Sequence, residues 1–271
     1  MRTRFIRHVR DRISGQLSPR LFCHLANFRN RLRGKSQRIK PAKQKGLYEV
    51  TDGQSRILIS QRNRHNRYKR GINHQVDVLA ADYHLHEINI RPGSLFIDCG
   101  ANVGELGIWA RNRNLRYLAV EPEELEALCC DLNNFEGDRR TVRKALWSEN
   151  SALTFYSKPE TADSSLIEIG EYGGKRTIEA LRLETLVRKM NLGRIHILKV
   201  EAEGAEPEVL EGAKNCFCDI EYIAIDCGYE RGIAKESTFV EVNNILTGSG
   251  FRMLKARFDR VTMLYQNKNV Q

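Results

Sequence analysis

The sequence predicts an α/β protein built on a doubly wound, mostly parallel sheet with an antiparallel hairpin at its C-terminal end. Short apolar runs alternate with helical stretches from about residue 95 onward, a pattern typical of parallel strands joined by helices. A glycine-rich turn follows the first of these runs and opens a helix. The last two apolar runs, at 251–255 and 261–265, have no helical stretch between them and predict the hairpin.

The composition is that of a globular protein. Of the 271 residues, 41% are hydrophobic and 29% are charged, which excludes disordered, collagen-like and integral-membrane classes. No apolar run reaches the ~18 residues of a membrane span, and no secretory leader is recognisable. The seven cysteines are odd in number and contain no Cys-x-x-Cys pair. We therefore expect free thiols, no metal site and a cytoplasmic location.

The basic character of the chain is confined to one end. Residues 1–75 contain 20 Lys and Arg against 3 Asp and Glu, a net charge of +17. The remaining residues contain 24 basic and 31 acidic side chains, a net charge of −7. The overall charge of +10 therefore describes the N-terminal segment and does not by itself indicate a function for the whole chain.

Residues 1–45 are interpreted as a basic amphipathic arm with a linker, followed by one domain over 46–271. Apolar residues recur in the arm at spacings of three and four, with arginines between them: Leu17, Leu21, Leu25, Phe28 and Leu32. Such a helix can lie on an anionic membrane surface, which predicts peripheral membrane contact through residues 1–33. Three alternatives stay open: a helix packed on the core, a mitochondrial transit peptide, or a nucleic-acid-binding arm. Residues 34–45 predict a linker.

The segment after the linker predicts a small hairpin and a helix. Residues 48–50 and 56–60 flank Asp52-Gly53, a dipeptide that favours tight hairpin turns. Residues 61–71 are polar and predict a loop. Residues 76–87 predict a helix that ends before a Pro-Gly pair.

The remaining elements alternate as a parallel sheet requires. Strands are expected at 95–98, 117–120, 142–146, 153–156, 195–200 and 222–226. Helices are expected at 104–112, 123–134, 182–190, 207–213 and 236–248. In such a sheet, ligands bind at the carboxyl ends of the strands, so side chains at those ends are the first candidates for a site.

The turn after the first of these strands predicts a nucleotide-type cofactor site. Its spacing is Asp-x-Gly-x-Asn-x-Gly, with Asn at a position where a third glycine is common, and Asn tolerates a positive φ better than most residues. An acidic residue ends the next strand, where it can accept hydrogen bonds from a ribose. The expected cofactor-binding residues are Asp98, Gly100, Asn102, Gly104 and Glu121.

The acid at the start of this turn discriminates between two cofactor classes. A dinucleotide presents a pyrophosphate to the helix N-terminus, and Asp98 would repel that anion. S-adenosylmethionine carries a sulfonium and an ammonium group, which a carboxylate favours. The turn therefore favours S-adenosylmethionine.

Five blocks of the chain, in order, resemble the FkbM family of S-adenosylmethionine-dependent methyltransferases. The blocks are the turn that starts at Asp98, the Glu121-Pro122 segment with Leu132-Asn133, residues 143–155, residues 177–186, and residues 197–213 with Lys199-Val200-Glu201-Ala202-Glu203-Gly204 at their centre. The resemblance covers about residues 75–265 and leaves 1–45 outside. It departs from the family at Glu184 and Glu201, where Asp is usual.

The resemblance implies a Rossmann-like class I methyltransferase with S-adenosylmethionine as cofactor. It also implies transfer of the methyl group to oxygen, on a hydroxyl of a sugar, a glycolipid or a polyketide-like natural product. Two other functions stay open. The basic N-terminal segment favours a nucleic-acid methyltransferase, and a non-catalytic binding module could keep the same fold.

Three charged residues at predicted strand ends are the catalytic candidates: Lys199, Glu201 and Asp226. Lys199 and Glu201 fall on one face of a strand, where a charge is costly unless it is paired. Glu201 can orient or deprotonate an acceptor hydroxyl, and Asp226 is a second candidate base. The alternative is a purely structural Lys199–Glu201 pair. A divalent metal between Glu201 and Asp226 is conceivable, although the spacing does not demand one.

Overall fold

The computed structural model describes residues 17–158, 164–170 and 172–270. The chain divides into two compact units, Met1–Gln75 and Val76–Gln271. This boundary lies beyond the one expected at 45/46. Residues 17–45 of the predicted arm therefore belong to a larger N-terminal unit, which also contains the predicted hairpin. Residues 1–16 of the arm lie outside the described residues.

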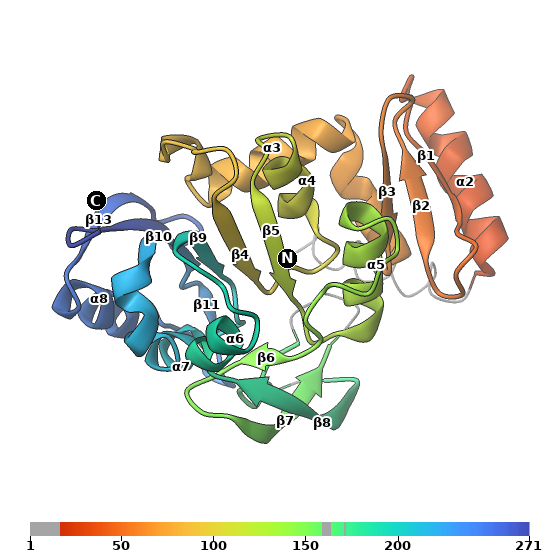
Figure 1. Ribbon diagram of the computed structural model, residues 1–271. Helices are drawn as coiled ribbons and strands as arrows, with labels where there is room; N and C mark the ends of the chain where they lie inside the picture. The colour runs from red at the N-terminus through yellow and green to blue at the C-terminus, as the bar shows by residue number, and fades with distance from the viewer. Residues whose placement is uncertain (1–16, 159–163, 171, 271) are drawn as a thin grey trace. The chain divides into compact units, whose positions relative to one another are not determined.

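The first unit is a helix with a three-stranded antiparallel sheet (Figure 1). Helix α2 (Pro19–Leu32) precedes strands β1 (Arg38–Pro41), β2 (Tyr48–Thr51) and β3 (Arg56–Ile59). The β2–β3 hairpin confirms the turn predicted at Asp52-Gly53. The loop expected at 61–71 contains a 3₁₀ helix, η1 (Arg62–Tyr68).

Strand β1 corrects the linker expected at 34–45. Ile39 pairs with Val50 of β2 and is buried, while its three neighbours in β1 are exposed. The side chain of Asn27 holds the strand to α2, because it both donates to the Ile39 carbonyl and accepts from the Ile39 N–H, each at 2.8 Å. One buried apolar residue among polar ones leaves no periodic signal in the sequence, so the strand resembles a linker.

Helix α2 begins at the residue pair Ser18-Pro19. The Ser18 hydroxyl accepts a hydrogen bond from the Leu21 N–H, and proline occupies the first turn, where its missing N–H costs nothing. Phe22, Cys23 and Ala26 are the buried apolar residues of the helix. Four residues of the predicted apolar stripe, Leu21, Leu25, Phe28 and Leu32, are exposed, so they are not the surface that packs on the core.

The second unit contains the predicted sheet. Six strands follow the order β13-β14-β10-β9-β4-β5: Phe251–Arg257, Thr262–Asn267, Ile220–Asp226, Ile195–Val200, Leu95–Cys99 and Arg116–Val120. The four strands from β10 to β5 are parallel. Strands β13 and β14 form the predicted antiparallel hairpin, and β14 also pairs antiparallel with β10. Strands β4, β9 and β10 are buried along their whole length, which explains their nearly continuous apolar sequences.

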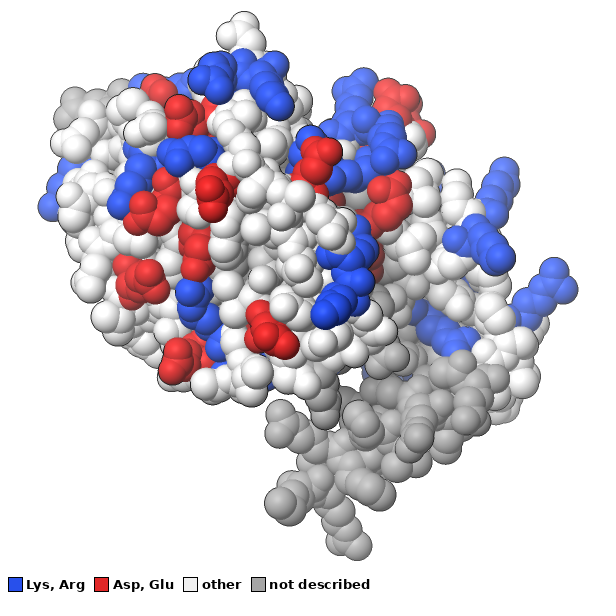
Figure 2. All heavy atoms as spheres, turned by 90° about the horizontal axis from the view of Figure 1, so that it is seen from below, with Lys and Arg blue, Asp and Glu red and all other residues white. Residues whose placement is uncertain are grey.

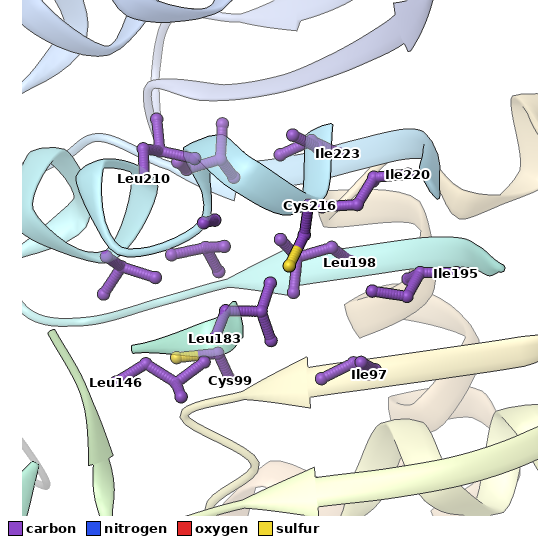
Figure 3. Packing of buried hydrophobic residues seen from close by; sticks show 14 of the residues in the cluster. Ile97, Cys99, Leu146, Leu183, Ile195, Leu198, Leu210, Cys216, Ile220 and Ile223 are labelled. Carbon is purple, nitrogen blue, oxygen red and sulfur yellow. The ribbon is translucent and has the colours of Figure 1, made fainter. Parts of the chain in front are cut away.

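Helices cover this sheet (Figure 1). They are α3 (Ile72–Asp82, which crosses the unit boundary), η2 (Leu85–Glu87), α4 (Glu105–Arg111), α5 (Glu124–Asn134), α6 (Leu183–Lys189), α7 (Glu206–Glu211), η3 (Lys214–Asp219) and α8 (Phe239–Gly248). Figure 3 shows part of the core, in which Leu198 and Ile223 of the sheet lie among side chains that include Leu183, Leu210 and Cys216. This packing fixes the strand ends on which the site depends.

Two smaller sheets complete the unit. Strand β8 (Gly174–Leu181) lies between β6 (Ala145–Leu146) and β7 (Ser151–Ser157). Strands β11 (Tyr229–Arg231) and β12 (Glu236–Ser237) pair with each other. The sequence did not predict β8, because five of its eight residues are exposed and only the end of the strand is apolar.

Candidate active site

The turn between β4 and α4 has the conformation expected from its spacing. Gly100, Asn102 and Gly104 have φ values of 76°, 50° and 81°, all in the left-handed region. A Cβ atom on Gly100 would lie 2.1 Å from the backbone oxygen of Glu201, so only glycine fits. The cofactor turn and the end of β9 are therefore in contact through their backbones.

Glu121 lies at the end of β5 and is tied to this turn. Its Oε2 accepts a hydrogen bond from the Asn102 N–H at 2.8 Å, and its Oε1 accepts one from the Glu123 N–H at 2.9 Å. Burial raises the pKa of the Glu121 carboxyl to about 7, although these two bonds favour the ionised form. A carboxylate has more acceptor positions than these two bonds use, so Glu121 can also accept hydrogen bonds from the ribose hydroxyls of a nucleoside.

Asp98 has a different environment from the one expected. It is buried, its Oδ2 accepts a hydrogen bond from the Tyr117 hydroxyl at 2.7 Å, and its Oδ1 lies 3.0 Å from Lys199 Nζ. Both oxygens therefore contact protein groups, and the cation that Asp98 neutralises is Lys199. The cofactor-binding role of Asp98 stays a prediction.

Lys199 contacts both the turn after β4 and Glu201. Its Nζ lies 3.2 Å from Glu201 Oε2 and donates to the backbone oxygen of Gly100 at 2.8 Å. Burial alone would lower the pKa of Lys199, but the negative charges of Asp98 and Glu201 outweigh burial and raise it above the ordinary value. Lys199 is thus a fixed cation and is not suited to accept a proton.

Glu201 follows β9 and is the more accessible of the two candidate carboxylates. Its side chain is 26% exposed, whereas that of Asp226 is 4% exposed. Burial alone would raise the pKa of Glu201, but Lys199 and Arg260 lower it to about 2. The carboxylate is therefore ionised and can accept a hydrogen bond at its exposed part.

Asp226 ends β10 and is more deeply buried than Glu201. Its Oδ2 accepts from Arg260 Nε at 2.9 Å, and its Oδ1 accepts from the Gly228 N–H at 3.0 Å. Burial and the negative charge of Glu201 raise its pKa above the ordinary value, against the effect of Arg260. The two carboxylates thus differ in the same way as many acid–base pairs, with one pKa lowered and the other raised.

Arg260 is the residue that sequence reasoning missed. It lies between β13 and β14, and its Nη2 reaches Glu201 Oε1 at 3.0 Å while its Nε binds Asp226. Its Nη1 also donates to Asp82 Oδ2 at 3.1 Å. The guanidinium occupies the space between Glu201 and Asp226 in which a divalent metal would be held. Within the described ranges, no group of three His, Cys, Asp or Glu side chains could bind a metal ion.

Tyr83 directly follows α3 and contacts the same cluster of charged side chains. Its hydroxyl hydrogen-bonds Glu201, and both Lys199 Nζ and the Arg260 guanidinium lie over its ring, 5.2 and 5.4 Å from the ring centroid. No signal in the sequence distinguished Tyr83 or Arg260, because both reach the site only through the tertiary fold. The predicted residues Lys199, Glu201 and Asp226 do lie together, and their catalytic roles stay predictions.

Comparison with known families decides the class of this site. Residues 98–253 match the family model of the methyltransferase FkbM domain. The chain belongs to the FkbM methyltransferase family. It is therefore an S-adenosylmethionine-dependent methyltransferase of the Rossmann-like class, with S-adenosylmethionine as its cofactor. The matched segment starts at Asp98 and includes all the other residues predicted to bind the cofactor or to act in catalysis.

Several solved methyltransferases are similar in structure to the chain. An FkbM methyltransferase from Methylobacillus flagellatus is 18% identical over 68% of this chain and 50% of its own, with a TM-score of 0.42. A magnesium protoporphyrin IX methyltransferase from Synechocystis with bound S-adenosylmethionine is 12% identical over 75% of this chain and 81% of its own, with a TM-score of 0.40. The chain thus spans half the length of this FkbM relative. No curated protein matches the chain.

Proposed function

We propose that this FkbM methyltransferase transfers the methyl group to a hydroxyl oxygen of a sugar, a glycolipid or a polyketide-like natural product. The observation that carries this proposal is the position of Glu201. Its ionised and partly exposed carboxylate lies at the carboxyl end of β9, beside the backbone of the cofactor turn. A carboxylate there can accept the hydrogen bond of an acceptor hydroxyl and direct the oxygen toward the cofactor.

Positioning is the first contribution of Glu201. When bound, the cofactor supplies a methyl group on a sulfonium centre. Alignment of an acceptor oxygen with that methyl group can by itself lower the barrier by about several kcal/mol, because the two reactants no longer have to find each other by diffusion. Lys199 and Arg260 hold the two oxygens of Glu201, which fixes the carboxylate before the acceptor arrives.

Proton removal is the second contribution. With a pKa of about 2, Glu201 is a weak base while both cations contact it. An acceptor hydroxyl that takes the place of Arg260 at Oε1 weakens the contact of Glu201 with one of the two cations, which raises the basicity of Glu201. Asp226, whose pKa is raised, holds Arg260 on its other side and is the second candidate to receive the proton.

Exposed apolar residues close in sequence to Asp226 and Arg260 support an amphipathic acceptor. Tyr229 and Ile233 follow the strand that ends at Asp226, and Phe258 lies two residues before Arg260; all three are strongly exposed. Such residues suit a glycolipid or a polyketide better than a nucleic acid. The net charge of −7 after residue 75 also disfavours a phosphate backbone at the methyltransferase unit, where Figure 2 shows acidic and basic side chains interspersed.

The cysteines accord with a cytoplasmic enzyme. All seven are free thiols and six of them are buried. Free thiols persist in a reducing compartment, so we place the enzyme in the cytoplasm.

Labelled S-adenosylmethionine tests the proposal. The full chain is incubated with separated glycan, lipid and RNA fractions of cells, and the labelled product is characterised by its linkage. We expect an alkali-stable methyl ether in the glycan or lipid fraction. Label in RNA would favour the nucleic-acid alternative, and cofactor binding without label in any fraction would favour a binding module.

A further inference from the structure

Helix α2 has two apolar faces. Phe22, Cys23 and Ala26 are buried. The second face is formed by four residues that are 47 to 73% exposed: Leu21, Leu25, Phe28 and Leu32. We call these four residues the α2 stripe.

The α2 stripe is a continuous line rather than a scatter of single residues. Its members are separated by four, three and four positions, and residues at those spacings lie above one another on a helix. At about 100° per residue, the line points away from Phe22, Cys23 and Ala26. Isolated exposed apolar residues are ordinary, but a contiguous line of large ones indicates a docking surface.

Basic side chains flank the α2 stripe. At about 100° per residue, Arg20 and Arg31 fall beside the line on one side. Arg33 follows the last turn as the C-cap residue, and all three arginines are exposed. The helix contains no acidic residue. Residues 17–75 together hold 15 Lys and Arg against Glu49 and Asp52 alone. The surface that surrounds the stripe therefore attracts anions.

We propose that α2 docks on an anionic phospholipid membrane, with the stripe at the level of the upper acyl chains and the arginines at the phosphates. Interfacial helices combine these two features, and long basic side chains reach the headgroups while their stems stay apolar.

The positive charge around the stripe disfavours other binding partners. A second copy of α2 would bring arginines against arginines. Residues 1–16 carry five arginines and one aspartate, so they would also add positive charge beside α2. RNA would use the arginines but gain nothing from the leucines. No described helix has the length and apolarity needed to span a bilayer. The proposal concerns a helix that lies in the interface.

Vesicle cosedimentation of the full chain tests the proposal without any methylation readout. Vesicles contain phosphatidylcholine alone or mixed with phosphatidylglycerol. The wild type should bind the mixed vesicles, and the variant L21S/L25S/F28S/L32S should bind them at least about tenfold more weakly, because burial of each large apolar side chain favours binding. The matched control L125S/M190S, which removes two similarly exposed apolar residues of the second unit, should bind as the wild type does.

A second pair of variants measures the contribution of the arginines to membrane binding. R20Q/R31Q/R33Q should weaken binding to anionic vesicles about tenfold or more, and high salt should have the same effect on the wild type. The control K175Q/R252Q/K268Q removes three exposed basic residues of the second unit and should change little.

The depth to which α2 enters the membrane can be measured independently. The emission of Phe28→Trp should be quenched by lipids brominated on their acyl chains, whereas that of Leu125→Trp should not. The proposal is overturned if the wild type ignores anionic vesicles, or if the stripe variant binds them like the wild type. It is also overturned if the stripe variant only loses self-association, or if RNA binding is the interaction that the arginine variant loses.

Discussion

Lys199 Nζ lies 3.0 Å from Asp98 Oδ1, and the two residues face each other on neighbouring parallel strands. Both side chains are almost completely buried. The pair joins the strand that carries the cofactor turn to the strand that carries Glu201. We infer that this ion pair fixes the position of the cofactor turn relative to Glu201.

Removal of the Lys199 charge should destabilise the fold. Lys199→Met leaves Asp98 as an uncompensated buried carboxylate, and such a loss costs ~3–5 kcal/mol. The double variant Lys199→Met/Asp98→Asn should recover a large part of that free energy, as measured by urea denaturation. Lys214→Met, which breaks an exposed pair with Glu211, serves as control and should cost less than ~1 kcal/mol. Equal losses in the single and double variants would show that the pair is not coupled.

Glu121 should govern cofactor affinity. Glu121→Ala removes the carboxylate that we assign to the ribose, and loss of hydrogen bonds to a charged group costs ~1.5–3 kcal/mol, or roughly 10–150-fold in affinity. Calorimetry with S-adenosylmethionine measures this effect, with the exposed Glu149→Ala as control. An unchanged affinity in Glu121→Ala would remove this residue from the cofactor site.

The raised pKa of Glu121 predicts a pH dependence of cofactor binding. Its carboxyl is protonated below a pKa of about 7 and ionised above it. Because the ionised form accepts more hydrogen bonds, affinity should rise with pH through that value. The rise should be absent in Glu121→Gln, which does not titrate. A rise of equal size in that variant would assign the titration to another group.

Arg260 should control the basicity of Glu201. Arg260→Gln removes one of the two cations that lower the pKa of Glu201, so this pKa rises toward its ordinary value. Ionisation of Glu201 is then lost at higher pH, and the acid limb of the kcat/KM profile should move to higher pH. Arg257→Gln, which removes an exposed arginine three residues away, should leave the profile in place. A profile that does not move in Arg260→Gln would separate Arg260 from the reacting carboxylate.

Local sequence features predicted the conformation of the turn after β4 and the place of Glu121 beside it. The left-handed conformation of Asn102 and the position of Glu121 follow from backbone sterics and from the alternation of strands and helices, both of which leave a local pattern. The β13–β14 hairpin was predicted for the same reason. The partners of Asp98 were not predicted, because they depend on which strand lies beside β4.

The acceptor side and the N-terminal unit were harder to predict. Arg260 contacts Glu201 across 59 residues of sequence, and nothing in its own turn marks that contact. The sequence of strand β1 resembles a linker because Ile39 is its one buried residue. The stripe on α2 was recognised as a line of apolar residues, but the sequence could not tell which of the two apolar faces packs on the sheet.

Single-turnover methylation by Glu201→Gln tests the central assignment most directly, with thermal melting of the same preparation beside it. The substitution keeps the size of the side chain and removes its charge. If Glu201 orients and deprotonates the acceptor, turnover should fall by ~10²-fold or more, while cofactor affinity stays near that of the wild type. Glu201→Asp should retain more activity, because Asp is the family's usual residue at this position. A Glu201→Gln variant that is stable and fully active would contradict the assignment.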